Sequence, residues 1–139
     1  MKRAEEQQVE RVAAFLVKNY PLQTVTVDFT SLVTNWINNA IVVDDNETGE
    51  IVGVAFYLMV DDVAINRMAD GVYKPWVASH FKEMTHRRGN NLHFWLLAMT
   101  QGRALTAGLR TVWQQIAPKS ISYFKPDLKT FVYMPREAK

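Results

Sequence analysis

Length, composition and charge narrow the classes of protein to which this chain can belong. It has 139 residues, 48% of them hydrophobic, which is enough for one compact domain over residues 1–139. It has no cysteine, which excludes disulfides, thiolate metal sites and cysteine nucleophiles and is compatible with a cytoplasmic protein. The formal net charge of +2 is too small to argue for nucleic-acid or membrane binding.

The N-terminal half is expected to form two helices and a β-hairpin. Residues 4–19 carry apolar side chains at helical spacing, and a shorter apolar pattern follows around Trp36. The β-rich runs 40–43 and 50–60 are joined by a polar, glycine-containing segment, which is typical of an antiparallel hairpin. No apolar stretch approaches the roughly 20 residues that a bilayer-spanning helix requires.

Further elements are expected in the C-terminal half. They are a helix from about Pro75 to near Gly89, a strand over 92–99, a helix ending at Ile116, and strands over 120–124 and 130–134. The order ααββ(α)βαββ predicts an α+β fold, or an α/β open sheet, with a mixed, mainly antiparallel sheet. The runs 51–60 and 92–99 are apolar on both faces and are expected to be adjacent at its centre.

The helix that ends at Ile116 is amphipathic. Its apolar side is formed by Leu105, Leu109, Val112, Trp113 and Ile116. This side is expected to lie on the sheet, with Val112 and Trp113 buried and with Arg110 and Gln114 in solvent.

The junction between the strand 92–99 and this helix is the most informative feature for function. The segment Thr100-Gln101-Gly102-Arg103 is short and polar, and the helix begins directly after it. Such a junction aims free backbone N–H groups and the positive end of a helix dipole at one point, where phosphates and other anions bind. Arg103 adds a fixed positive charge. The alternative interpretation is an ordinary turn with a solvated arginine.

These features resemble the GNAT superfamily of CoA-dependent acyltransferases, in which two helices precede a β-hairpin, a strand, a phosphate-binding loop and a long helix. The family loop has the pattern Gln/Arg-x-x-Gly-x-Gly/Ala, and Gln101-Gly102-Arg103-Ala104-Leu105-Thr106 matches its first position. Ala104 and Thr106 replace a glycine and a small residue, so their β-carbons are expected to narrow the approach of a pyrophosphate. The short chain ending resembles toxin-activating lysine acyltransferases and small phage-encoded GNAT-like proteins.

The resemblance implies a set of site residues. Residues 101–106 would hold the pyrophosphate of acetyl-CoA or another acyl-thioester, and backbone groups would face the pantetheine arm at Leu97, Ala98 and Met99. His93, or a bound water, would be the general base, because imidazole titrates near neutrality. Tyr123 lies close to where many family members place a tyrosine that protonates the departing thiolate. Both side chains are also interpretable as packing residues of their strands.

Two functions remain open. The first is direct acyl transfer, without a covalent enzyme intermediate, from acyl-CoA or acyl carrier protein to an amine of a protein or small molecule. The second is a catalytically inactive GNAT-like scaffold, a structural or interaction protein, for example in a phage particle, with an interface that includes Trp76, Trp95 and Trp113.

A homo-oligomer is compatible with both functions, and a nucleic-acid module has the weakest basis of the functions considered. No metal site is expected, since His80, His86 and His93 lack the i, i+4 spacing of a helix-borne ligand pair.

Overall fold

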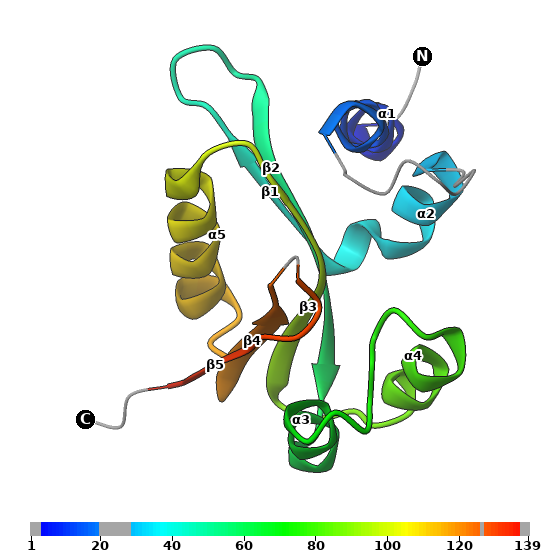
Figure 1. The fold of residues 1–139 in the computed structure, drawn as a ribbon. Coiled ribbons are helices and arrows are strands. Elements are labelled where there is room, and N and C mark those ends of the chain that lie inside the picture. The colour runs from blue at the N-terminus through cyan, green and yellow to red at the C-terminus, as the bar shows by residue number, and fades with distance from the viewer. Residues whose placement is uncertain (1–3, 20–28, 126, 137–139) are drawn as a thin grey trace. The chain divides into compact units, whose positions relative to one another are not determined.

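The computed structural model of this chain describes residues 4–19, 29–125 and 127–136. Figure 1 follows its helices and strands along the chain. They are α1 (Ala4–Asn19), α2 (Phe29–Trp36), a short 3-10 helix (Ile37–Asn39), β1 (Ala40–Asp44), β2 (Ile51–Val60), α3 (Asp62–Ala69), α4 (Ala78–Thr85), β3 (Asn91–Met99), α5 (Gly102–Gln115), β4 (Ser120–Phe124) and β5 (Phe131–Pro135). The sequence predicted each helix and strand except α3 and the 3-10 turn, and α4 is shorter than expected.

Five strands form one sheet in the order β1-β2-β3-β4-β5. β1 pairs antiparallel with β2, β3 pairs parallel with β4, and β4 pairs antiparallel with β5. Thr100 N–H donates to Val52 at one end of β2, and Gly89 N–H donates to Met59 at the other, so β2 and β3 run in opposite directions. The prediction of a mixed, mainly antiparallel sheet with β2 beside β3 is confirmed.

The chain divides into two compact units. The first comprises Met1–Phe56 and Leu96–Val112, and the second comprises Tyr57–Trp95 and Trp113–Lys139. β2, β3 and α5 contribute residues to both units. A single domain over residues 1–139 stays a prediction.

In the first unit, α5 approaches β1 through its smallest side chains. A Cβ on Gly108 would lie 3.6 Å from Val43 Cγ2, which is ordinary van der Waals contact. The fully buried residues of α5 are Ala104, Gly108 and Val112, spaced four apart along one line. The sequence predicted that Leu105 and Leu109 face the sheet, and the buried line lies one residue before each of them. The small side chains on this line allow the helix to approach the sheet closely.

The position of this buried line determines which of the other α5 residues are exposed. Val112 is buried and Arg110 and Gln114 are exposed, as predicted. The prediction that Trp113 is buried is wrong, because it is only half-buried.

In the second unit, α3 begins at an aspartate cap that the sequence analysis did not recognise. Asp61 is the N-cap, and its carboxylate accepts a hydrogen bond of 2.8 Å from Ala64 N–H. The helix then buries three apolar side chains at helical spacing, Ala64, Ile65 and Met68. An Asp-Asp pair directly before an i, i+3 apolar pattern was therefore the available signal.

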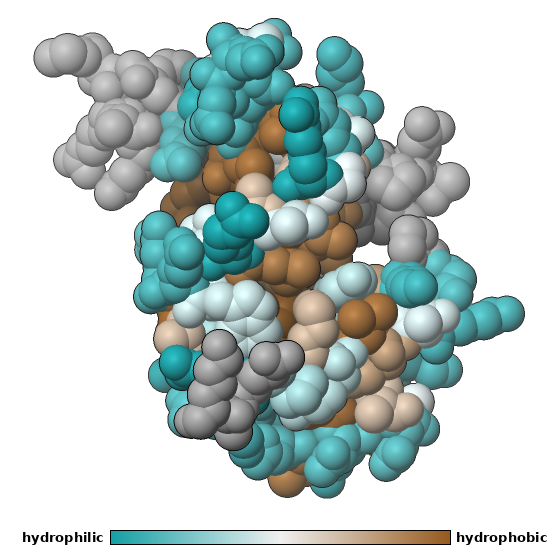
Figure 2. All heavy atoms as spheres, turned by 90° about the vertical axis from the view of Figure 1, so that its left-hand side faces the viewer, coloured by the Kyte–Doolittle hydropathy of each residue, from teal (hydrophilic) through white to brown (hydrophobic). Residues whose placement is uncertain are grey.

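Some large hydrophobic side chains remain at the surface. Figure 2 shows brown hydrophobic areas between teal hydrophilic ones on one side of the molecule. The exposed members of the described residues include Val17, Val63, Val72, Trp76, Leu128 and Tyr133. Within the described ranges, no helix is both long enough and apolar enough to cross a bilayer.

Two glycine substitutions should move stability in opposite directions. A Cβ on Gly89 would lie 2.5 Å from the Val60 carbonyl oxygen, a backbone atom that cannot rotate away. Gly89→Ala should therefore cost on the order of 1–3 kcal/mol of unfolding free energy. Gly108→Ala has room and adds helix propensity, so it should gain up to about 1 kcal/mol. Urea titration of both variants measures the two changes, and a neutral Gly89→Ala would contradict the close approach.

Candidate functional site

The predicted phosphate loop joins the end of β3 to the first turn of α5 in the first unit. Thr100 holds its start, because its backbone N–H and its Oγ1 both donate to the Val52 carbonyl, at 2.9 and 3.1 Å. Ala104 N–H donates to the Gln101 carbonyl at 3.1 Å and closes the first turn. The loop is thus fastened to β2, and the first N–H groups of α5 have no partner within the helix.

Gly53 on β2 allows this close fastening. A side chain at Gly53 would collide with the Met99 sulfur and come within 3.4 Å of the Ala104 methyl. Ala104 is buried, with its methyl toward Gly53. Ala104 also lines the pocket beside the loop, and the expectation that it narrows the approach of a pyrophosphate stays a prediction. Thr106 is exposed, so its β-carbon remains on the open side of the helix.

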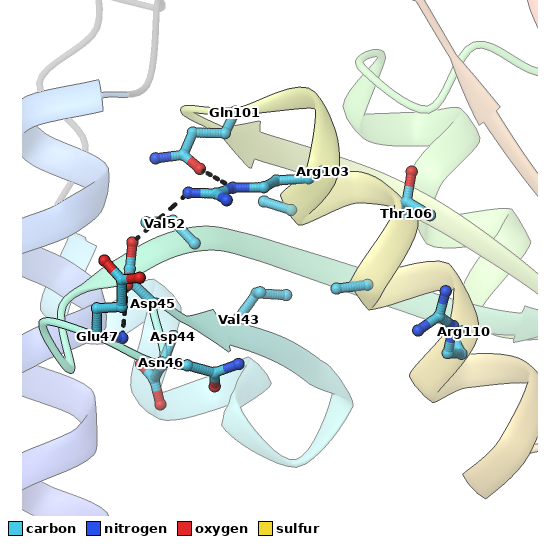
Figure 3. Close-up of a pocket in the computed structure, with 12 residues that line it drawn as sticks. Val43, Asp44, Asp45, Asn46, Glu47, Val52, Gln101, Arg103, Thr106 and Arg110 are labelled. Carbon is cyan, nitrogen blue, oxygen red and sulfur yellow. Dashed lines mark hydrogen bonds and ion pairs between the residues drawn. The ribbon is translucent and has the colours of Figure 1, made fainter.

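A pocket of about 460 Å³ lies in the first unit between the β1–β2 connection and the first half of α5. Four residues of the predicted loop line it, Gln101, Arg103, Ala104 and Thr106. Gly102 and Leu105 do not. Figure 3 shows Arg103 directed from α5 toward the β1–β2 connection, with Thr106 and Arg110 further along the helix.

The opposite wall of this pocket is acidic, which the sequence analysis did not foresee. Asp44, Asp45 and Glu47 line it. Asp45 is fixed by its own turn, because its Oδ1 accepts hydrogen bonds from Glu47 N–H at 2.8 Å and Thr48 N–H at 3.3 Å. In the sequence, the signal for this acidic wall was the run Asp44-Asp45-Asn46-Glu47 at the hairpin connection, which in the structure faces the start of α5.

Arg103 is engaged on both sides of the pocket. Its Nε donates to Gln101 Oε1 at 2.6 Å, and its Nη2 lies 3.9 Å from Asp45 Oδ2. The Arg103 side chain is 80% exposed, so this ion pair is weak and readily exchanged for another anion. An incoming phosphate would compete with Asp45 for the guanidinium.

The end of β3 also lies in the first unit, and it extends beyond its pairing with β4. The parallel register runs from Asn91 opposite Ser120 to Phe94 opposite Tyr123. β4 ends one residue later, at Phe124. In the described part of the chain β4 therefore offers no ladder partner to Leu97, Ala98 and Met99, the three residues expected to face a pantetheine arm.

His93 lies in the second unit and is fully buried. Its Nδ1 is 2.9 Å from Ser122 Oγ, and its ring stacks on Phe131 with 6.2 Å between centroids. Burial lowers the pKa of His93 from 6.5 to about 3, so the ring is neutral at pH 7. A general base must reach the proton that it removes. That role stays a prediction, and it requires that the ring be uncovered.

Tyr123 and His93 do not lie on one face of the sheet. His93 is opposite Ser122 and Phe94 is opposite Tyr123 in the β3–β4 register. Because neighbouring residues of a strand point to opposite faces, Tyr123 lies on the other face from His93. The structure therefore does not bring the two candidate catalytic side chains together.

The fully buried polar side chains of the described residues all belong to the β3–β4 pair. They are Asn91, His93, Ser120 and Ser122. Ser120 Oγ donates to Asn91 Oδ1 at 2.7 Å, and Asn91 Nδ2 donates to Asp62 Oδ1 at 2.9 Å. The hydrogen bond from Lys119 lowers the pKa of Asp62. His93 Nε2 has no hydrogen-bond partner among the described residues.

No group of three His, Asp or Glu side chains within the described ranges is placed to hold a metal ion.

Comparison with solved structures identifies a related fold. The chain superposes on the structure of GphF, a GNAT-like decarboxylase in complex with isobutyryl-CoA, with a TM-score of 0.57 and 13% sequence identity. The chain has a GNAT-like fold. The match covers 88% of this chain but 63% of the GphF chain, so this chain spans less than two thirds of that protein's length. No protein-family model and no curated protein matches the sequence.

The burial of His93 should make stability depend on pH. Between about pH 6.5 and 3 the unfolded state binds a proton on this residue and the folded state does not. Stability is therefore full above this window and falls by about 1.4 kcal/mol per pH unit within it, from this residue alone. Urea titrations at pH 7, 6 and 5 should show this slope in the native chain and a shallower one in His93→Gln. Equal slopes would mean that the ring is accessible to protons in the folded state.

Proposed function

We propose that the chain is a cytoplasmic protein that binds an acyl-thioester, acetyl-CoA or a related donor, and transfers the acyl group to an amine. The loop Thr100–Arg103 and the first turn of α5 would receive the donor's phosphates, and the end of β3 would receive its pantetheine arm. The acceptor amine would belong to a protein or a small molecule.

One observation carries this proposal. β3 runs five residues past the end of its register with β4 and leads directly into the first turn of α5. The strand end thus has backbone groups that β4 does not use, beside a helix N-terminus that attracts anions. GphF, which has a similar fold, binds isobutyryl-CoA in its structure.

The side chains and backbone of the loop would contribute in different ways. A Cβ on Gly102 would meet nothing within 4 Å, so the space in front of this residue is open. The N–H groups and the helix dipole would supply fixed positive potential there, and Arg103 would add a mobile charge. Because Gly53 has no side chain, Met99 and Ala104 can lie close to β2, which positions the loop.

The transfer itself would need two proton movements. As the amine nitrogen bonds to the acyl carbon and the carbon–sulfur bond breaks, the nitrogen loses a proton and the thiolate gains one. Tyr123, half-buried on β4, stays the candidate donor to the thiolate. A bound water, or His93 once uncovered, would accept the proton from the amine.

The second candidate is a GNAT-like scaffold without catalytic activity, serving as a structural or interaction protein. Two observations favour it. The acidic wall of Asp44, Asp45 and Glu47 repels an anionic donor, and His93 is sealed and neutral. Binding of the donor, measured separately from turnover, distinguishes the two candidates.

Substitutions at Gly102 test donor binding. Acetyl-CoA at about 100 times its dissociation constant should raise the unfolding free energy of the native chain by roughly 2.7 kcal/mol, seen as a melting shift. Gly102→Asp should abolish the shift, because it places an anion where the phosphates must lie. Gly102→Asn, which has nearly the same size without the charge, should retain most of it.

Arg103→Ala should only weaken donor binding, because the backbone N–H groups and the helix dipole remain. If calorimetry detects no binding of CoA or an acyl-thioester to the native chain at millimolar ligand, the scaffold becomes the better account. Binding without acyl transfer to any amine would support a donor-binding protein that lacks turnover.

The acidic wall predicts a variant with tighter binding. Asp45→Asn keeps the oxygen that accepts the Glu47 and Thr48 N–H groups, but it removes the charge that holds Arg103. Affinity for CoA should rise about two- to fivefold, the range expected from loss of one exposed competing ion pair. Asp70→Asn removes an exposed charge from the second unit and is the control. An unchanged or lower affinity in Asp45→Asn, measured by calorimetry, would contradict competition for Arg103.

A further inference from the structure

Four aromatic side chains of the second unit lie on one face of the β4–β5 pair or pack against that face. Trp76 packs edge-on against Phe124 with 5.1 Å between ring centroids, and Phe124 packs against Phe131 at 5.0 Å. Tyr133 is two residues beyond Phe131 on β5 and therefore points to the same face. We call these four residues the aromatic face.

The aromatic face is open to solvent at both ends and supported in the middle. Trp76 is 44% exposed and Tyr133 is 45% exposed, while Phe124 and Phe131 are half-buried. The buried ring of His93 stacks beneath Phe131 and meets Phe124 edge-on at 5.9 Å. Phe124, Phe131 and the Trp76 ring that packs on Phe124 are therefore held in place before any partner arrives, so their binding would cost little side-chain entropy.

Exposed cations lie close in sequence to the residues of this face. Among the described residues from 125 to 136, three exposed cations, Lys125, Lys129 and Arg136, stand against one acid, Asp127. The carboxylate of Asp127 faces its own turn, where it accepts hydrogen bonds from Lys129 N–H and Thr130 N–H, both at 2.9 Å. Lys74, two residues before Trp76, is also exposed. Described cations thus outnumber described acids in the segments that carry these rings, although the chain as a whole carries only +2.

We propose that the aromatic face binds single-stranded nucleic acid. Exposed rings on a sheet surface stack on unpaired bases, and flanking Lys and Arg side chains attract the phosphates between them. A protein partner fits less well, because lysine is depleted in protein–protein interfaces. The inference uses only residues of the second unit and is independent of donor binding at the α5 loop.

Fluorescence anisotropy with a short labelled oligothymidylate tests the proposal. At low salt the native chain should bind with a dissociation constant on the order of 10⁻⁵ M, and the affinity should fall as salt rises. A duplex should bind more weakly, because its bases are already stacked. Trp76 should report binding as a change in tryptophan emission that is lost in Trp76→Phe.

Matched variants separate stacking from general charge attraction. Tyr133→Ala should weaken binding roughly tenfold, and Tyr133→Phe, which keeps the ring, should bind like the native chain. Lys129→Ala should lower the slope of log affinity against log salt by about 0.7. Lys18→Ala, the removal of an exposed charge from α1, should leave the slope unchanged.

Four results would each overturn the proposal, and the first three concern affinity and charge. They are no anisotropy change at low salt with about 1 mM protein, equal affinity for duplex and single strand, and equal effects of Lys129→Ala and Lys18→Ala. Binding that survives Tyr133→Ala unchanged would also overturn it, since the rings would then take no part.

Discussion

The missing side chain of Gly53 is the constraint on which the candidate donor site depends. Met99, the last residue of β3, occupies the space that a Cβ at this position would fill, and the methyl of Ala104, in the first turn of α5, would lie 3.4 Å from that Cβ. Thr100, between them, donates twice to the neighbouring Val52 carbonyl. These contacts set where β3 ends and where α5 begins. The direction of the helix dipole and of the free N–H groups follows from them.

The two ends of β3 have different chemistry. Near Asn91 the strand contributes polar side chains that hydrogen-bond inside the protein, Asn91 to Ser120 on β4 and Asp62 on α3, and His93 through its Nδ1 to Ser122. Near Met99 it contributes backbone groups that β4 leaves unpaired. While His93 is enclosed and neutral, its imidazole cannot exchange protons with a substrate. A chemical step that requires a titrating side chain would then use another residue.

The order of elements was predictable because it rests on local patterns. Apolar spacing identified α1, α5 and the strands, and the Gly-containing connection identified the hairpin. The errors have a different cause. Trp113 was judged by its size, whereas the small residues Ala104 and Gly108 decide which side of α5 meets the sheet. Burial of His93 and the acidic wall at Asp45 depend on residues distant in sequence, so no local pattern contains them.

The buried polar pairs of β3 and β4 also bear on how these strands find each other. Parallel strands have no tight turn to align them, and here the paired residues are separated by 29 positions in the chain. A shift by one residue would turn Asn91 and His93 to the other face of the sheet. A shift by two in one direction would place Phe124 opposite His93 and remove the oxygen from its Nδ1. A shift by two in the other would place Ser120 opposite His93 and take it away from Asn91. A buried polar group left without its partner costs about 1–3 kcal/mol, so the pairs favour the native alignment.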